Sequence, residues 1–308
     1  MGGTGTLSHY DRLSKIVRHD VFAFENDDEP LGNILQSITI AGADILMVVN
    51  NSQRVVVADH FSMKKKGELI GFSSPRYAAV VNGKAYVSDW TSNTVAVFSM
   101  SDYSLIKKID VGTGPEGMFV KGTKLWVANG GGFGIDSTVS IIDLLGDTLF
   151  YTLVVDHNPH SFAQDIDGHL WVLCSGYNDW SDPANSTAGA LWQFHTSSLA
   201  VVRRLMFTKT DKHPVHLKSD AIGEYIYWLD NNYSASVVRK RTLDDLLPSS
   251  AHISGSFYGL GLDPLTGELY TADPLDYNQN GIIIRHQSNG TPLDTIEGGI
   301  IPSNFAFN

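Results

Sequence analysis

A short pattern of turn and strand residues recurs about every 40 to 55 residues and constrains the fold more than any other feature of the chain. In its clearest copy, PRYAAVVNGKAYVSD from Pro75, one strand leads through Asn82 and Gly83 into a second strand that ends at Asp89. Asn-Gly is a preferred dipeptide for a two-residue β-hairpin. We therefore predict a hairpin at each recurrence of the pattern.

Five other copies keep this order. Two are close to the first, PEGMFVKGTKLWVAN from Pro115 and PHSFAQDIDGHLWVLCS from Pro159. Three are looser: PVHLKSDAIGEYIYWLD from Pro214, FYGLGLDPLTGELYTAD from Phe257 and LQSITIAGADILMVVN from Leu35. Most copies continue with an alternating apolar strand and a weaker fourth strand. Four short strands per repeat, without long helical periodicity, are typical of the blade of a β-propeller.

A seventh copy, PSNFAFN, begins at Pro302 and stops at the end of the sequence. The N-terminal segments TLSHYDRL and DVFAFEN alternate as two further strands would, so we predict a closing blade shared by both termini. One strand, the second of that blade, is missing by this count. The prediction is an all-β, seven-bladed propeller in a single domain, residues 1–308, with a closing blade of residues 302–308 plus 1–32. The other blades are expected at residues 33–74, 75–114, 115–158, 159–213, 214–256 and 257–301.

Five segments carry a resemblance to one family of repeat proteins. They are SPRYAAV at Ser74, PLGNILQSITI at Pro30, VVNNS at Val48, YGLGLDPLTGELYTADPLDYNQNGIIIR at Tyr258 and GGIIPSNFAFN at Gly298. With these segments the chain resembles YVTN-type, YncE-like propellers, and more closely the surface-layer-protein-like subgroup of Bacteroides and its relatives. The similarity covers essentially the whole chain. Members of the subgroup usually begin with a strand of the type VLNEG, which is absent here and is the same strand that the count above finds missing.

The resemblance implies an exported protein, typically a lipoprotein on the outer-membrane surface. One relative, BtuG, captures cobalamin for a TonB-dependent transporter, so the resemblance implies a non-enzymatic binding protein with cobalamin or a related nutrient as ligand. Residues 1–15 contain no apolar signal segment, and no apolar stretch reaches the roughly 18 residues that cross a bilayer. We therefore expect that a signal and any lipid anchor would lie outside this sequence.

The composition agrees with one β-rich domain. The 308 residues are 43% hydrophobic and include 29 glycines, which supplies a large core and many turns. The 22 basic residues are scattered and outnumbered by 33 acidic ones, for a net charge of -11, which argues against a nucleic-acid partner. The single cysteine, Cys174, lies in an apolar strand and is expected to be buried.

Two sets of loops should share one face of the propeller: the loop before each first strand and the loop between each second and third strand. These loops are long, whereas the hairpins of the opposite face are short, so we expect the binding site on the loop-rich face. The longest loop runs from Gly176 to Gly189. Aromatic residues in such loops of five blades, bordered by acidic and amide groups, suit an amphipathic planar ligand or a sugar. These aromatic residues are Trp90, Phe133, Tyr177, Trp180, Tyr233 and Tyr277. The alternative is that they pack between blades.

The residues just after each turn are expected at the mouth of the central channel. They are Gln36, Arg76, Tyr77, Glu116, His160, His216, Tyr258 and Asn304. We assign Arg76, Tyr77 and Tyr258 among them to the ligand site. Arg76 would either hold a ligand carboxylate or phosphate, or pair with Glu116 across two blades.

Histidines in the segments HNPH and KHPVH suggest a metal site on two adjacent blades. The candidate ligands are His157, His160, His213 and His216. Imidazole is the commonest metal ligand in proteins, but this spacing matches no zinc signature, so a structural role is the alternative. No nucleophile elbow, zinc-protease motif or Walker loop is present, and no catalytic residue or cofactor is assigned. The histidines favour an alternative function as a metal-dependent lyase or hydrolase, and a third possibility is a surface-assembly or adhesion module without a small ligand.

Overall fold

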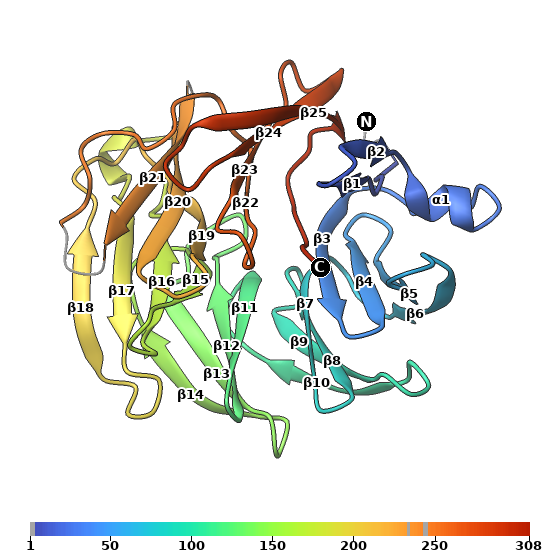
Figure 1. Cartoon of the computed structure of the whole chain (residues 1–308). Coiled ribbons are helices and arrows are strands. Elements are labelled where there is room, and N and C mark those ends of the chain that lie inside the picture. Colours follow the sequence, from blue (N-terminus) through green and yellow to red (C-terminus); the bar gives the residue numbers. More distant parts are fainter. Residues whose placement is uncertain (1–3, 233–234, 243–245) are drawn as a thin grey trace.

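The computed structural model describes residues 4–232, 235–242 and 246–308, and it confirms the predicted all-β propeller. Six sheets of consecutive antiparallel strands stand around a ring (Figure 1). We call them blades one to six in chain order. In each blade the first strand lies nearest the centre of the ring, and each following strand pairs with the one before it. Among the described residues, no apolar helix has the length that crossing a membrane requires.

The strands have the following bounds. Blade one contains β3 (Leu35–Ala41), β4 (Asp44–Val49), β5 (Arg54–Asp59) and β6 (Lys65–Ile70). Blade two contains β7 (Pro75–Val81), β8 (Lys84–Asp89), β9 (Thr94–Ser99) and β10 (Leu105–Asp110). Blade three contains β11 (Pro115–Lys121), β12 (Lys124–Asn129), β13 (Thr138–Asp143) and β14 (Thr148–Val154). Blade four contains β15 (Pro159–Gln164), β16 (Leu170–Cys174), β17 (Ala190–Phe194) and β18 (Val201–Met206). Blade five contains β19 (Val215–Ser219), β20 (Tyr225–Asn232) and β21 (Ala235–Thr242), and blade six contains β22 (Gly259–Leu262), β23 (Leu269–Asp273), β24 (Asn280–His286) and β25 (Pro292–Ile300).

The turn chemistry of the repeat explains why these hairpins form. Between β7 and β8, Asn82 and Gly83 have φ values of 54° and 72°. Two consecutive positive φ values are those of the type I′ turn, whose twist matches the strands that it joins. The first strands of blades one to five also contain a register shift near their N-terminal ends, as between Pro115 and Met118 in β11.

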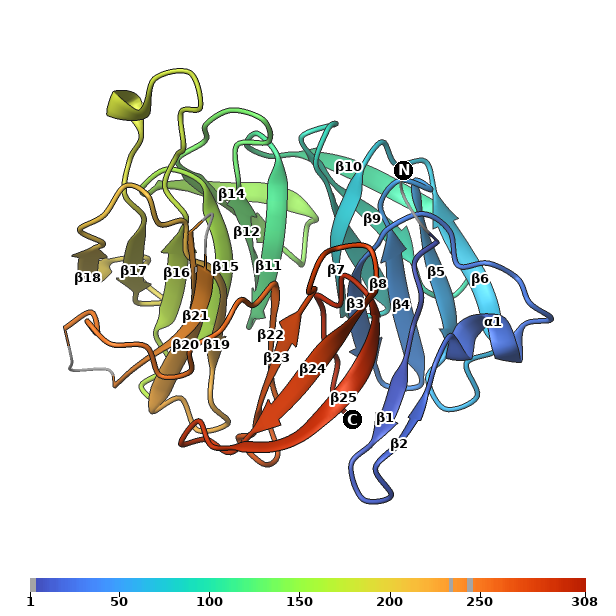
Figure 2. The same ribbon diagram turned by 90° about the horizontal axis from the view of Figure 1, so that it is seen from above.

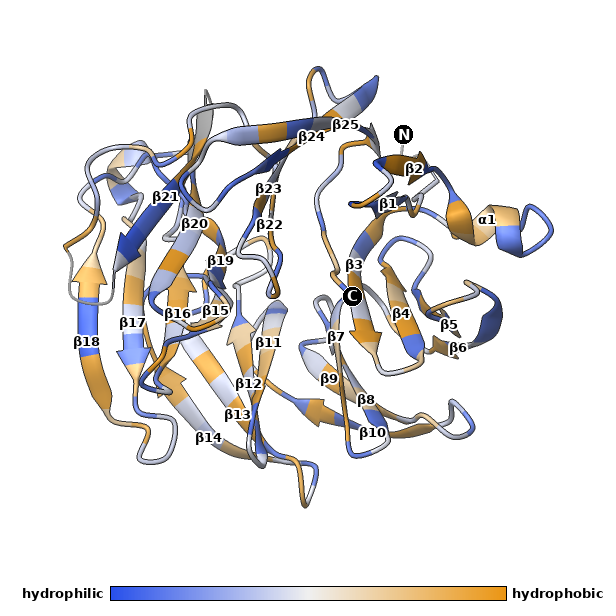
Figure 3. Ribbon diagram, in the orientation of Figure 1, coloured by the Kyte–Doolittle hydropathy of each residue, from blue (hydrophilic) through white to orange (hydrophobic). Residues whose placement is uncertain are grey.

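The core lies between neighbouring blades and is built mainly by second and third strands. All five residues of β16 are buried, and Trp171 is fully inaccessible. Trp126 of β12 packs against Phe194 of β17 with ring centroids 6.1 Å apart, which joins blades three and four. Figure 3 shows the corresponding contrast in hydropathy, because β16 is mostly hydrophobic whereas the outer strand β18 carries a hydrophilic band.

The fifth blade differs from the predicted four-stranded pattern. Within its described residues it contains three strands, and an isolated bridge joins Val238 to Ile253 where a fourth strand was expected.

The C-terminal residues 302–308 pass between β22 and β3, where the first and last blades face each other (Figure 1). Asn304 Nδ2 donates a hydrogen bond to the carbonyl oxygen of Gln36 at 2.6 Å. Phe305 packs against Tyr270 of β23 with ring centroids 6.0 Å apart. A Cβ atom at Gly259 would lie 2.4 Å from the carbonyl oxygen of Ser303, so this close approach requires glycine.

The N-terminal residues form a separate two-stranded sheet of β1 (His9–Asp11) and β2 (Ile16–Arg18). Lys15 and Asp294 of β25 hold it against blade six with an Nζ–Oδ1 distance of 2.8 Å.

The strand predicted for the segment DVFAFEN is wrong, because Val21–Glu25 form helix α1. Phe22 is fully buried in α1 whereas Phe24 is 80% exposed. Residues two apart lie on one face of a strand but on nearly opposite sides of a helix, so the helix buries one ring and leaves the other at the surface.

Candidate functional site

The loop-rich face is the one on which every first strand begins. Its longest loop includes a short 3-10 helix, η1 (Pro183–Asn185), and stands out from the ring in Figure 2. Asp179 stabilises this loop, because its carboxylate accepts hydrogen bonds from the hydroxyl and the backbone amide of Ser181 at 2.6 and 2.9 Å. Hydrogen bonds from Ser181, and next from the amide of Asp182, lower the pKa of Asp179 to about 2. The loop is therefore shaped by its own polar contacts.

Arg76 occupies the centre of this face and joins three blades. Its Nε donates to Oε2 of Glu116 at 3.1 Å, and a terminal nitrogen lies 3.0 Å from Oε1 of the same carboxylate. Its other terminal nitrogen donates to Oε1 of Gln36 at 2.7 Å. Of the two roles considered for Arg76, the structure contains the ion pair between blades.

Tyr77 lies beside this ion pair. Burial raises the pKa of Tyr77, and the Glu116 carboxylate raises it further. Its hydroxyl therefore stays protonated at neutral pH, and it is hydrogen-bonded to the side chain of Gln36, a contact that acts to lower the pKa.

One aromatic pair lies next to Arg76. The rings of Trp90 and Phe133 meet edge to face with centroids 4.6 Å apart, and the Arg76 guanidinium carbon lies 5.6 Å from the Trp90 ring centroid. Phe133 is 99% exposed. This pair presents apolar surface to solvent beside a charge that is already neutralised.

A second aromatic pair comes from blade six. Tyr258 and Tyr277 meet edge to face with centroids 6.0 Å apart, and they are 45% and 51% exposed. Burial acts to lower the pKa of Arg76, but the Glu116 carboxylate raises it more, and the nearby phenol of Tyr258 makes a smaller contribution in the same direction. Four of the proposed aromatic residues thus form two pairs near one central ion pair, and each pair contains at least one exposed ring.

The other aromatic residues of the prediction have different positions. The backbone amide of Tyr177 donates to Oγ1 of Thr187 at 3.0 Å, which closes the base of the long loop. Trp180, in the same loop, is 77% exposed. Tyr233 lies outside the described residues.

The structure brings two of the four candidate histidines together. The rings of His160 and His216 meet edge to face with centroids 5.7 Å apart. Burial lowers the pKa of His160, and it lowers the pKa of His216 to about 3, so both imidazoles are neutral at pH 7. His157 Nδ1 instead contacts Oγ1 of Thr187 at 2.9 Å, and His213 Nδ1 contacts the carbonyl oxygen of Ser175 at 3.1 Å.

Within the described part of the chain, one group of three side chains has metal-ligand spacing, and it does not include these histidines. It contains Asp165, Asp167 and His169 at the opposite, hairpin face. The Asp165 carboxylate already accepts hydrogen bonds from Trp171 Nε1 at 2.8 Å, Gln193 Nε2 at 2.7 Å and the amide of His169 at 2.8 Å. Three donors on one buried carboxylate indicate a structural role.

Sequence reasoning missed a pocket at the hairpin face whose wall includes Lys218. The sequence did contain a sign of this pocket, since Lys218 is a lone cation in the inner strand segment PVHLKS. The side of the sheet on which the Lys218 side chain lies could not be predicted, because the register of β19 against β20 shifts between Val215 and Lys218.

Comparisons with known proteins agree with the fold. A family model described as a domain of unknown function (DUF5074) matches residues 2–300. No curated protein matches the chain.

Three solved structures share the architecture at low sequence identity. Hydrazine synthase from Kuenenia stuttgartiensis is 18% identical, with a TM-score of 0.67 over 87% of this chain and 88% of that chain. A quinonprotein alcohol dehydrogenase-like protein from Bacteroides thetaiotaomicron is 14% identical, with a TM-score of 0.75 over 96% of this chain and 74% of that chain. The β-propeller domain of Cps50 (Swd1) from Myceliophteria thermophila is 11% identical, with a TM-score of 0.65 over 88% of both chains. At these identities the similarity shows the fold alone.

Proposed function

Because the chain belongs to the DUF5074 family, whose function is undefined, we propose from its geometry that it is a non-enzymatic propeller that binds a small amphipathic ligand on its loop-rich face. The observation that carries the proposal is the presence of two aromatic pairs near the Arg76 ion pair, Trp90 with Phe133 and Tyr258 with Tyr277. Three of these four rings are exposed, and Trp90 is half-buried. Aromatic rings provide contact area at a low cost in side-chain entropy, so they suit capture by a preformed surface.

The charges of the site favour a ligand without a strong anionic group. Glu116 already neutralises Arg76, and displacing that contact would leave the Glu116 carboxylate, which is 8% exposed, without its partner. A planar ligand with amide groups at its edge could stack on the rings and exchange hydrogen bonds with the loops. Cobalamin has this chemistry, and it is also the ligand suggested by the resemblance to YncE-like surface propellers and to BtuG.

The same resemblance supports a proposed place of action. The protein would act at the cell surface, attached to the outer membrane by a lipid anchor outside this chain, and would pass its ligand to a TonB-dependent transporter. We also propose that the β1–β2 sheet and residues 302–308 together serve as a seventh blade. The supporting contacts are Lys15 with Asp294, Asn304 with Gln36, and Phe305 with Tyr270.

Calorimetric titration with cyanocobalamin tests the proposal, with the corrin absorption spectrum followed in parallel. We expect saturable binding that EDTA does not change and that Trp90→Ala and Tyr277→Ala each weaken at least tenfold. Phe61→Ala is the matched control, because Phe61 is 80% exposed but lies in a hairpin of the opposite face. Absence of heat and of a spectral change at micromolar protein would remove cobalamin from the proposal.

One observation favours a second candidate, a metal-dependent lyase or hydrolase. His160 and His216 are close together and neutral, which is the form of imidazole that binds metal. Cyanocobalamin binding that disappears in EDTA, or tight Zn²⁺ binding lost in His216→Asn, would favour this candidate. Absence of both cyanocobalamin binding and Zn²⁺ binding would favour a surface-assembly or adhesion module without a small ligand.

A further inference from the structure

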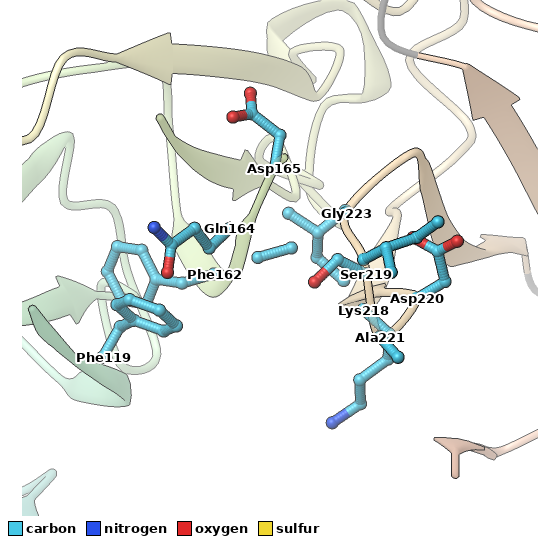
Figure 4. Close-up of a pocket in the computed structure, with 12 residues that line it drawn as sticks. Phe119, Phe162, Gln164, Asp165, Lys218, Ser219, Asp220, Ala221 and Gly223 are labelled. Atoms are coloured by element: carbon cyan, nitrogen blue, oxygen red, sulfur yellow. The ribbon is translucent and has the colours of Figure 1, made fainter. Parts of the chain in front are cut away.

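A pocket of about 420 Å³ lies at the hairpin face, on the side of the ring away from the aromatic pairs. Inner strands of blades three, four and five contribute to its wall (Figure 4). The turn between β19 and β20, residues 220–223, completes it. This volume falls within the usual range for small-molecule sites.

One side of the pocket is aromatic. Phe119 of β11 and Phe162 of β15 lie with ring centroids 6.5 Å apart, and both rings are partly buried. In Figure 4 they lie together, across the pocket from Lys218 of β19. They offer a surface for a flat apolar group.

Lys218 has no counter-charge in the described part of the chain. No hydrogen bond or ion pair connects its ammonium group to any described residue, and burial lowers its pKa. Its charge also lowers the pKa values of His160 and His216, after the larger effect of burial on each, so it acts on two neutral neighbours.

The acidic residues of the pocket are engaged elsewhere. Asp165 accepts the three hydrogen bonds described above, and Oδ1 of Asp220 accepts the amide of Tyr225 at 3.0 Å. Neither carboxylate lies within 4 Å of the Lys218 ammonium group, since no salt bridge of Lys218 occurs among the described residues. A partly buried cation without an anion is unfavourable, and an anionic ligand would remove that cost.

We propose that this pocket binds a small aromatic anion, with a carboxylate or phosphate group at Lys218 and a ring against Phe119 and Phe162. Lys218 supplies the charge-assisted hydrogen bonds, and the two rings supply apolar contact. The site is separate from the one under the proposed function, since it uses the other face and none of the same residues. The two proposals can therefore fail independently.

Binding of benzoate and phenyl phosphate, with benzyl alcohol as the uncharged analogue, tests the proposal by ligand-observed NMR and calorimetry. We expect one site per chain for at least one of the two anions and no binding of benzyl alcohol at the same concentration. The two anions distinguish a carboxylate site from a phosphate site.

Lys218→Met should weaken binding of the anion at least tenfold, whereas Lys218→Arg should retain that binding. Lys209→Met is the control, because Lys209 is exposed outside the pocket. Lys218→Met removes an unpaired charge, so it should fold and melt no lower than the original protein, and Phe162→Leu gives a second test through the ring contact. Failure of both anions to bind at millimolar concentration, or equal binding by Lys218→Met, would overturn the proposal.

Discussion

Arg76 and Glu116 fasten blade two to blade three through a two-point contact, with Nε to Oε2 at 3.1 Å and a terminal nitrogen to Oε1 at 3.0 Å. The Glu116 side chain is 8% exposed and that of Arg76 is 23% exposed. The pair therefore belongs to the framework that holds the loop-rich face in shape.

Removing one partner of this pair should destabilise the protein more than removing both. Arg76→Met leaves the Glu116 carboxylate buried without a cation, and we expect a loss of about 3 kcal/mol in the free energy of unfolding. Adding Glu116→Met should recover part of that loss. Urea unfolding of the two single variants and the double variant measures the coupling energy between Arg76 and Glu116. Strictly additive losses in the free energy of unfolding would contradict the prediction.

Stability should fall as the pH drops below about 6.5, partly because of the channel histidines. The pKa of His216 is about 3 in the folded protein, chiefly through burial, and that of His160 is also lowered. Between the folded-state pKa of His216, about 3, and the ordinary histidine pKa of about 6.5, the unfolded chain binds more protons than the folded chain. The free energy of unfolding therefore increases with pH in this window, by up to about 1.4 kcal/mol per pH unit for each histidine. His216→Asn should reduce this slope, and Asn tolerates the positive φ of 58° at the site.

Unfolding curves between pH 4.5 and 7.5 provide the measurement. Carboxylates such as Asp59 and Asp179, whose pKa values are near 2 because of hydrogen bonds from Ser62 and Ser181 respectively, also lose stabilising interactions in acid. The difference in slope between the original protein and His216→Asn isolates the histidine contribution. Identical slopes would rule out His216 as a source.

Phe133→Ala should separate ligand binding from stability. Because Phe133 is 99% exposed, its removal should change the free energy of unfolding by less than about 0.5 kcal/mol. The same change should lower the affinity for cyanocobalamin about tenfold if the Trp90–Phe133 pair stacks on the ligand. Calorimetry and urea unfolding of one preparation provide both numbers, and an unchanged affinity would exclude Phe133 from the site.

Asp165→Asn should lower the free energy of unfolding through lost hydrogen bonds, without any metal being involved. An amide has one acceptor oxygen where the carboxylate has two, so it cannot serve Trp171, Gln193 and the His169 amide equally well. We expect a loss of about 2 kcal/mol. Thermal unfolding should be the same in EDTA and in micromolar Zn²⁺, and a large shift of the melting temperature with Zn²⁺ would assign Asp165, Asp167 and His169 to a metal instead.

Phe305→Ala should weaken the contact between the C-terminal segment and blade six. Phe305 packs on Tyr270 at 6.0 Å and on Phe307 at 6.4 Å, so we expect a loss of about 2 kcal/mol. Phe24→Ala on α1 is the control, because Phe24 is 80% exposed. Equal unfolding curves for the two variants would show that the segment contributes little to stability.

The regular part of the fold could be predicted because its signals are local. The Asn82-Gly83 turn depends on the φ values of two adjacent residues, and short apolar strands such as β9, whose first five residues are buried, carry their pattern within a few residues. The segment of Val21–Glu25 could not be assigned in this way, since a short apolar run is compatible with strand or helix. Packing of Phe22 against blade one accompanies the helix in the folded chain.

The site was predictable in outline and less so in its contacts. Loop position identified Trp90, Phe133, Tyr258 and Tyr277 as neighbours of one face, and the structure pairs them. Sequence could not choose between the two roles of Arg76, because Glu116 is 40 residues away and the choice depends on how two blades pack. The register shift before Lys218 likewise depends on pairing with β20.

The position of residues 302–308 has a consequence for how the protein is made. A ribosome releases all six blades before it releases the residues that connect the last blade to the first. Until then Tyr270 lacks its phenylalanine neighbours and Gln36 lacks Asn304, so the nascent ring stays open at one seam. Closure of the ring is thus a late step in biosynthesis, because Asn304 and Phe305 are added after all six blades.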